Sequence, residues 1–221
     1  MKANNKLNNI ILLIMLIGLT ACTGKASVVL QDTTCSAPCW HNIEAGKTNI
    51  DQAINLLNQV PELEPGSIRR GKNYQTMIEG ISAGFLNSKE LSLQIFFIDE
   101  KATAMRFSYE EDISLSDAIK KFGEPKYVFT NALKGDPAVY LTTKFYYPDQ
   151  GVCLLHQNRG FILRIPETYR INRTTNITNI YYVDPALQNG QIEYGCFTGG
   201  NENDLNLRKQ DWKGYSNYSI P

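Results

Sequence analysis

Residues 90–109, ELSLQIFFIDEKATAMRFSY, have the clearest strand pattern in the chain and decide the expected fold. Apolar side chains alternate with more polar ones over residues 91–97, and the alternation returns over residues 103–109. A period of two is typical of a strand with one buried face. The polar residues 99–101 separate the two runs, so the sequence predicts an antiparallel hairpin.

A helix is predicted before this hairpin. Apolar residues recur at helical spacing across residues 50–60, so one helix face is expected to pack on a sheet. Thr48 is the expected N-cap, with Asp51 at the third position of a capping box, and Pro61 is expected to end the helix. Residues 61–71 contain turn-forming residues.

A second helix is predicted after the hairpin. Ser114 is the expected N-cap with Asp117 at the third position, and Gly123 is expected to end the helix. Residues 50–57 and 115–122 resemble each other at an offset of 65 residues, and strands follow each segment. The chain therefore contains either a duplicated helix-then-meander unit or two amphipathic helices of similar composition.

Runs rich in aromatic and β-branched residues predict further strands at 74–78, 81–86, 127–130, 139–147, 152–156, 161–165 and 180–183. Turns at 148–151 and 158–160 are expected to separate the later ones. The expected fold class is α+β, with short helices packed on an antiparallel sheet and tandem repeats as one interpretation. We expect a first α+β unit at residues 35–109 and a second at residues 110–221, ending in an irregular C-terminal extension.

The N-terminal residues have the pattern of a secretory signal peptide. Lys2 and Lys6 supply positive charge, no acidic residue precedes Cys22, and residues 10–19 form an apolar core. This core is shorter than the roughly 20 apolar residues that a membrane-spanning helix needs. An N-terminal segment that stays buried in the membrane, and a signal cut by ordinary signal peptidase, are the alternatives.

The leader ends in Leu19-Thr20-Ala21-Cys22, which resembles the lipobox of bacterial lipoproteins. The resemblance implies that residues 1–21 are removed and that Cys22 carries acyl chains such as palmitate. Residues 22–34 would then form a lipidated tether, because several acyl chains hold a protein where one chain holds it marginally. Thr23 rather than Asp follows the cysteine, which permits an outer-membrane or cell-surface position in the cell envelope.

Two further segments resemble known lipoproteins. Gly46-Lys47-Thr48 and Phe122-Gly123-Glu124-Pro125 resemble the G-x-T and L-G-x-P signature of small outer-membrane lipoproteins of the SmpA/OmlA type. In that family both halves of the signature lie in one repeat, whereas here they lie on different helices. The resemblance implies the helix-plus-sheet layout of tandem β-lactamase-inhibitor-like domains. The segment from Cys35 to Thr48 is similar to a set of uncharacterised bacterial lipoproteins.

Composition and charge exclude some classes of function. The 221-residue chain is 43% hydrophobic and 20% charged, which is ordinary for a globular protein. Two of its 22 basic residues and none of its 22 acidic residues precede Cys22, so the remaining 200 residues have a formal charge of −2. Because no long run of Lys and Arg is present, nucleic acid is not an expected partner.

Four cysteines remain once Cys22 is assigned to lipidation: Cys35, Cys39, Cys153 and Cys196. An even number in an exported protein predicts two disulfides, with three connectivities open. Cys35 and Cys39 can close a local bridge, which pairs Cys153 with Cys196, or both can join the distant cysteines. A metal site of Cys35, Cys39, His41 and Cys196 is a weaker alternative, since no second closely spaced pair is present.

No catalytic or cofactor motif points to an enzyme. His41 and His156 are the two histidines, and no Gly-x-Ser-x-Gly is present, so we expect no catalytic site, no cofactor and no metal. A binding or scaffold module that presents its sheet to an envelope protein is the first hypothesis. A small-molecule-binding lipoprotein is the alternative, and an envelope hydrolase is less favoured. The aromatic residues that could line such a ligand groove, or lie half-buried in strands, are Tyr140, Phe145, Tyr146, Tyr147, Tyr181 and Tyr182.

Overall fold

The computed structural model describes residues 27–72, 78–134, 139–162, 165–187 and 209–220. Its central hairpin consists of β5 (Glu90–Ile98) and β6 (Lys101–Ser114), which pair antiparallel. Asp99 and Glu100 join them with φ values of 49° and 63°. Two positive values fit the two-residue turns whose twist matches the paired strands. The predicted hairpin is confirmed, and β6 extends beyond its predicted end.

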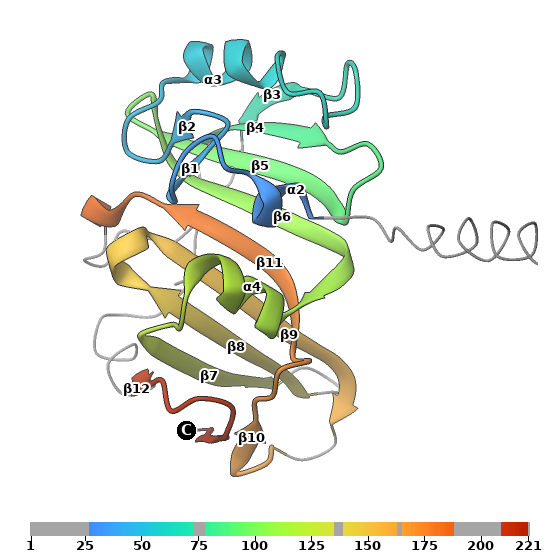
Figure 1. Ribbon diagram of the computed structural model, residues 1–221, viewed down its shortest axis with the longest axis vertical. Helices are drawn as coiled ribbons and strands as arrows, with labels where there is room; N and C mark the ends of the chain where they lie inside the picture. The colour runs from blue at the N-terminus through green and yellow to red at the C-terminus, as the bar shows by residue number, and fades with distance from the viewer. Residues whose placement is uncertain (1–26, 73–77, 135–138, 163–164, 188–208, 221) are drawn as a thin grey trace, which may run out of the picture.

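One nine-stranded sheet runs through the molecule in the order β12-β7-β8-β9-β11-β6-β5-β4-β3 (Figure 1). Every pair of neighbouring strands in it is antiparallel. Strand β6 crosses the predicted boundary between residues 109 and 110, so both predicted units belong to one sheet. The remaining strands of the sheet are β3 (Arg69–Lys72), β4 (Glu79–Gly84), β7 (Tyr127–Lys134), β8 (Val139–Tyr147), β9 (Val152–Ile162), β11 (Asn176–Val183) and β12 (Lys209–Asp211).

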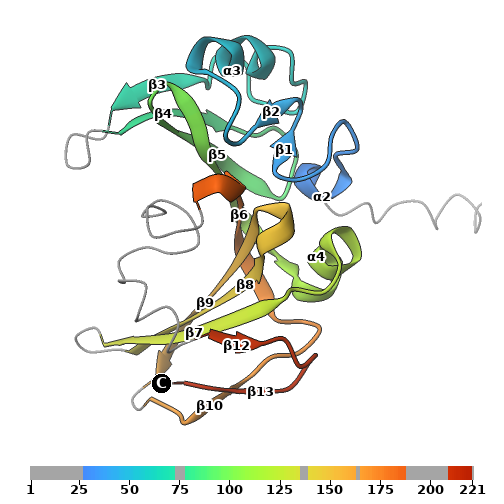
Figure 2. The same ribbon diagram turned by 90° about the vertical axis from the view of Figure 1, so that its left-hand side faces the viewer.

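The other elements are short. Figures 1 and 2 show α2 and α4 against one face of the sheet. The opposite face, here called the open face, carries no α-helix among the described residues. The chain is therefore mainly an antiparallel sheet with a few short helices. These elements are α2 (Val28–Gln31), β1 (Cys39–Trp40), β2 (Ile43–Glu44), α3 (Ile50–Leu57), α4 (Leu115–Phe122), η2 (Pro148–Gln150), β10 (Thr168–Arg170), η3 (Pro185–Leu187) and β13 (Asn217–Ser219).

The start of α3 differs from the sequence-based expectation. Asn49 is the N-cap, and it forms a capping box with Gln52 in which each side chain accepts from the other residue's backbone N–H. The predicted cap, Thr48, instead accepts a hydrogen bond from the backbone N–H of Glu44 at 2.8 Å. The helix also ends at Leu57 rather than near Pro61. A contact outside the helix therefore decided which of two adjacent polar residues caps it.

The start of α4 agrees with the prediction. The Ser114 hydroxyl accepts a hydrogen bond from the backbone N–H of Asp117 at 3.1 Å. The pKa of Asp117 is lowered by hydrogen bonds from Lys120 and then Ser114. Gly123 follows the helix with a φ of 80°, a value that glycine adopts without strain.

Replacing Ser114 with Ala should lower the free energy of unfolding by about 1 kcal/mol, because one N–H of the first helical turn loses its acceptor. Equilibrium urea denaturation would measure the change. Ser36→Ala is the matched control, since Ser36 is exposed and caps no helix. Equal stability of the two variants would contradict the capping role.

Both halves of the sheet share one core on the face that carries the helices. Trp40 and Phe107 meet edge to face with ring centroids 5.3 Å apart, and Phe107 contacts Tyr182 at 5.5 Å. Phe122 of α4 contacts Tyr182 at 6.1 Å. Ala53 of α3 belongs to the same buried cluster. The core is therefore continuous from α3 to α4, across the predicted unit boundary.

Several predicted strands and turns need correction. The turn region 61–71 contains strand β3, and the expected strand at 74–78 lies mostly outside the described residues. The expected turn at 158–160 lies inside β9, which joins the two strands predicted at 152–156 and 161–165. The pairing of β8 with β9 shifts register at this point, so the Gly-containing segment is a β-bulge rather than a turn.

The predicted C-terminal extension is only partly described. Residues 209–220 contain two short strands, β12 and β13, while residues 188–208 lie outside the description. Trp212 stacks on Tyr218 with ring centroids 6.0 Å apart, and Tyr218 is 1% exposed. The end of the chain is therefore packed onto the sheet rather than irregular in this part.

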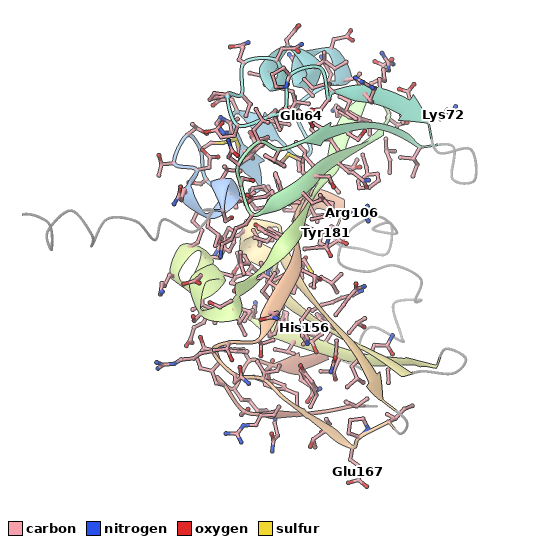
Figure 3. The ribbon with its side chains drawn as sticks, turned by 90° about the vertical axis from the view of Figure 1, so that its right-hand side faces the viewer. Glu64, Lys72, Arg106, His156, Glu167 and Tyr181 are labelled. Atoms are coloured by element: carbon pink, nitrogen blue, oxygen red, sulfur yellow. A yellow bond between two sulfur atoms is a disulfide. The ribbon has the colours of Figure 1, made fainter. Side chains whose placement is uncertain are left out.

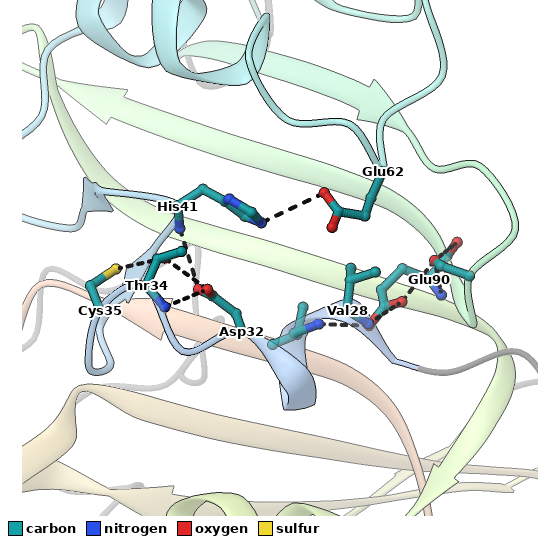
Figure 4. A network of polar contacts seen from close by, with 9 residues as sticks. Val28, Asp32, Thr34, Cys35, His41, Glu62 and Glu90 are labelled. Atoms are coloured by element: carbon teal, nitrogen blue, oxygen red, sulfur yellow. Dashed lines mark hydrogen bonds and ion pairs between the residues drawn. The ribbon is translucent and has the colours of Figure 1, made fainter.

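The predicted tether at residues 22–34 is wrong over residues 27–34, because that part packs on the domain. Ser27 is 7% exposed and caps α2. The Glu90 carboxylate accepts from the Ser27 hydroxyl at 2.5 Å and from the backbone N–H groups of Val28 and Val29 at 3.1 and 3.2 Å (Figure 4). It also accepts from the Ser88 hydroxyl at 2.8 Å. Glu90 thus fixes the first described residues to β5.

Within the described residues, no helix is both long and apolar enough to cross a bilayer.

Candidate functional site

A row of polar side chains crosses the open face of the sheet. Strand register places Arg69 of β3 opposite Ser82, Ser82 opposite Gln94, Gln94 opposite Arg106, and Arg106 opposite Tyr181. Directly paired residues of antiparallel strands lie on the same face. Five strands therefore bring these side chains into one line, which ends at Tyr181. Figure 3 shows Arg106 and Tyr181 next to each other, midway along the molecule.

A groove lies beside this row because two paired residues lack side chains. Gly71 of β3 is opposite Gly80 of β4, and Gly80 is opposite Phe96 of β5. The groove has a volume of about 290 Å³, and Arg69, Gln94 and Phe96 line it together with the two glycines. A Cβ atom at Gly71 would meet no other atom within 4 Å. The floor is therefore open backbone, which a ligand can approach closely.

Arg106 is a half-buried cation without a carboxylate partner in the described part of the chain. Its guanidinium donates to the Gln94 carboxamide oxygen, while its buried Nε has no hydrogen-bond partner among the described residues. The ion pairs formed among the described residues do not involve it. Burial raises the pKa of Tyr181, and the charge and hydrogen bond of Arg106 partly offset this. A buried donor left unpaired is costly, which favours an anionic or carbonyl ligand here.

Strand β3 adds positive charge at the edge of the sheet. Its four residues are exposed, and three of them are Arg69, Arg70 and Lys72. Arg70 lies 3.3 Å from the Glu79 carboxylate, an exposed pair of small energetic value. Arg69 donates to the backbone carbonyls of Gly66 and Ile68. Among the described strands β3 pairs only with β4, so its outer edge can accept another strand.

Comparison with known proteins adds no information about the function of this groove. Protein-family models, curated proteins and solved structures contain no match to the chain. The function is therefore argued from the groove, its charges and the strand edge.

The predicted cysteine sites are described in part. Cys35 and Cys39 form a disulfide with their Cα atoms 5.7 Å apart, which is the local pairing among the three open connectivities. Cys153 is also disulfide-bonded, but its partner lies outside the described residues. Its pairing with Cys196 stays a prediction, as does the lipidation of Cys22, because both of those residues lie outside the description.

The alternative metal site loses two of its ligands to this disulfide. Oxidised Cys35 and Cys39 present no thiolate, the form that binds metal. Among the described residues, no group of three or more His, Cys, Asp or Glu side chains could hold a metal ion.

Each histidine contacts polar groups of neighbouring segments of the chain. His156 is 7% exposed, and its ring nitrogens lie 2.6 Å from the Asn176 carbonyl and 2.7 Å from the Tyr169 hydroxyl. It therefore joins β9 to β10. The Nε2 atom of His41 lies 3.8 Å from Glu62, and its backbone N–H donates to Asp32. The pKa of Asp32 is raised by partial burial, but hydrogen bonds from Thr34 and His41 outweigh this and lower it.

The aromatic residues predicted to line a groove divide between the two faces. Phe145, Tyr147 and Tyr182 lie in the main core under the helices. Tyr146 and Tyr181 belong to a smaller cluster on the open face with Cys153 and Phe129. The side chain of Tyr140 lies outside the description. Most of this set is therefore core, and Tyr181 alone borders the polar row.

The residues that form the groove were missed by sequence reasoning. Gln94 and Arg106 occupy positions between the buried residues of β5 and β6, where polar side chains normally face water. In the sequence, Gly71 indicated only a turn, and Gly80 indicated only an interruption between two strands. A second hollow of about 420 Å³ near α3 is lined by Asn42, Thr48, Gln52, Asn55 and Leu56. It carries no charged group, so it is a weaker candidate.

Proposed function

We propose that this chain is a lipid-anchored, non-enzymatic binding module of the cell envelope. It binds an extended acidic segment of an envelope protein along the outer edge of β3 and across the adjacent groove. The observation that carries the proposal is the placement of Arg69 and Lys72 in the lining of a glycine-floored groove, at a strand edge that is unpaired among the described residues. Arg106 lies next to this groove, opposite Gln94 of its lining.

Binding by strand addition uses both features of the site, the outer edge of β3 and the groove next to it. Main-chain hydrogen bonds to the outer edge of β3 would supply affinity, and alternate side chains of the added strand would reach the groove. At about 290 Å³ the groove is at the low end for a drug-sized ligand and suits one or two side chains. The cations favour Asp or Glu in the bound segment.

Reversing the charge of this edge should abolish partner capture. The double variant Arg69→Glu/Lys72→Glu places two carboxylates where the bound segment carries its own, which should weaken binding by roughly tenfold or more. Crosslinking in intact cells, followed by pull-down from membranes, would measure recovery of the partner. The matched control is Lys101→Glu/Lys213→Glu, because both lysines are exposed and the change in net charge is the same.

Gly71→Val is the second variant, and it tests the groove without changing charge. Its Cβ meets no neighbour within 4 Å, and valine suits an exposed strand, so the fold should persist. Recovery of the partner should fall as in the charge variant. Undiminished recovery with both variants would exclude β3 as the binding edge.

Arg106 supports a second candidate, a small-molecule-binding lipoprotein. Its unpartnered Nε could be satisfied by a small carboxylate or phosphate rather than by a peptide. A thermal-shift screen of small anions distinguishes the two functions. Stabilisation that Arg106→Gln removes, together with no crosslinked protein partner, would favour the small ligand.

We also infer that the two halves are tandem repeats of a helix followed by four strands. The supporting observation is the shared order of elements in the nine-stranded sheet, α3 before β3-β4-β5-β6 and α4 before β7-β8-β9-β11. Strand β10 lies between β9 and β11 in the chain but pairs with β13 in a separate sheet. Both helices have eight residues, and they begin 65 residues apart, at Ile50 and Leu115. The last strands of the two units, β6 and β11, pair antiparallel at the centre of the sheet.

A further inference from the structure

Two of the three large apolar side chains that are exposed in the described residues lie close together in the chain. Leu86, in the connection between β4 and β5, is 41% exposed, and Leu91, the second residue of β5, is 57% exposed. The third, Tyr215, is 39% exposed and follows β12 at the other edge of the sheet. Single exposed apolar residues are common, so the surroundings of this pair decide whether it is a binding surface.

A β-bulge turns Leu91 outward. Glu90 pairs with Tyr109 and Ser92 pairs with Ser108, so β5 contains one residue more than β6 between these pairs. That extra residue is Leu91, which has no partner across the strand. Bulges redirect side chains at strand ends. The neighbouring Glu90 is 2% exposed, so adjacent residues differ sharply in exposure.

The same few residues hold the start of the described chain. Glu90 accepts hydrogen bonds from Ser27 and Val28, and Ser88 in the β4–β5 connection donates to Glu90. Figure 4 shows Val28 beside Glu90, and Figure 1 shows the β4–β5 connection beside the start of α2. The two leucines therefore lie where residues 1–26 join the domain.

The length of chain before Ser27 limits the distance of this surface from a lipid at Cys22. Ser27 is the fifth residue after Cys22, and five residue steps of fully extended chain span about 17 Å. Because Ser27 is hydrogen-bonded to Glu90, the residues that follow Ser27 cannot lengthen the connection to Cys22. An anchor at Cys22 thus keeps the leucine pair next to the bilayer surface.

Positive charge lies beside the leucines. Lys89 lies between Leu86 and Leu91 in the chain, and its charge helps to lower the pKa of Asp117 at the start of α4. Lys120 of α4 pairs with the same carboxylate at 2.8 Å. Apolar side chains bordered by lysines fit the interface of a membrane that contains anionic phospholipid.

We propose that Leu86, Lys89 and Leu91 form a membrane-docking surface that inserts into the lipid interface beside the anchor. This inference rests on the proposed lipidation of Cys22. Docking sets the orientation of the domain. Lys72 lies on the side of the molecule away from α2 (Figure 3), so the proposed binding edge points away from the lipid.

Depth-dependent quenching tests the docking surface with the mature lipidated protein. Leu91→Trp and Leu86→Trp would each be reconstituted in vesicles of phosphatidylethanolamine and phosphatidylglycerol with or without brominated acyl chains. The emission that the added tryptophan contributes should fall about twofold in brominated vesicles, as expected for a side chain at the acyl boundary. Tyr215→Trp is the control at the far edge of the sheet, and its contribution should stay unquenched. Trp40 and Trp212 are common to all variants.

The outcomes separate the anchor from the docking. Equal quenching at positions 91 and 215, or none at 86 and 91 in protein that floats with the vesicles, would overturn the docking surface and leave the anchor intact. Loss of flotation only in Cys22→Ser supports the anchor. Failure of wild-type protein to carry acyl chains by mass spectrometry would refute the anchor and the docking together.

Discussion

Replacing Glu90 with Ala should lower the free energy of unfolding by about 3 kcal/mol or more, because one carboxylate serves four donors. The hydroxyls of Ser27 and Ser88 and the N–H groups of Val28 and Val29 all lose their acceptor. Ser27 and Ser88 are 7% and 5% exposed, so water cannot readily replace the carboxylate. Urea denaturation of the Cys22→Ser background, which avoids detergent, would measure the loss.

A local measurement separates this role from general destabilisation. Hydrogen exchange at Val28 and Val29 should accelerate in the Glu90 variant before the rest of the sheet opens. Ser88→Ala removes one of the four donors and should cost only about 1 kcal/mol. Unchanged protection of α2 in Glu90→Ala would show that α2 is held by packing alone.

Replacing Trp40 with Ala should cost about 4 kcal/mol, the second large effect that we expect. Trp40 is fully buried, and its ring contacts Phe107 at 5.3 Å, Phe85 at 5.8 Å and His41 at 4.5 Å between centroids. Removing it leaves a cavity among rigid strands and the Cys35–Cys39 loop, where the surroundings can collapse only in part. Urea denaturation of Cys22→Ser protein would again report the change.

Trp40→Phe is the matched control because it keeps an aromatic ring. The indole Nε1 has no hydrogen-bond partner in the described structure, so phenylalanine loses volume without losing a bond. We expect a cost of about 1 kcal/mol. A comparable cost for both variants would point to an unrecognised indole contact instead of cavity formation.

Sequence patterns predicted the elements that are stabilised by contacts between residues close together in the chain. The alternation at residues 91–97 and 103–109 identified the β5–β6 hairpin, and Ser114 identified the start of α4. Strand β3 was missed because its sequence, Arg-Arg-Gly-Lys, has no apolar alternation; it forms by pairing with β4 at the sheet edge. The prediction of Thr48 as the N-cap was wrong because its hydroxyl accepts a hydrogen bond from the backbone N–H of Glu44. That contact lies outside the helix, so the helical pattern did not show it.

The candidate site depends on register and could not be predicted in the same way. Arg69, Gln94 and Arg106 come from three strands, and each is unremarkable as a surface position. Shifting one strand by a single residue would move its side chain to the opposite face. The pairing of Gly71 with Gly80 creates the groove only because β3 and β4 meet in this register.

The sequence by itself determined that the chain forms an antiparallel hairpin with a capped helix after it, and it predicts a lipidated N-terminus at Cys22. Those features depend on neighbours within a few residues. The tertiary structure alone decided that residues 27–34 pack on β5, that both halves share one sheet, and that cations surround a glycine-floored groove. Those features require contacts between residues such as Ser27 and Glu90, whose separation along the chain leaves no local pattern.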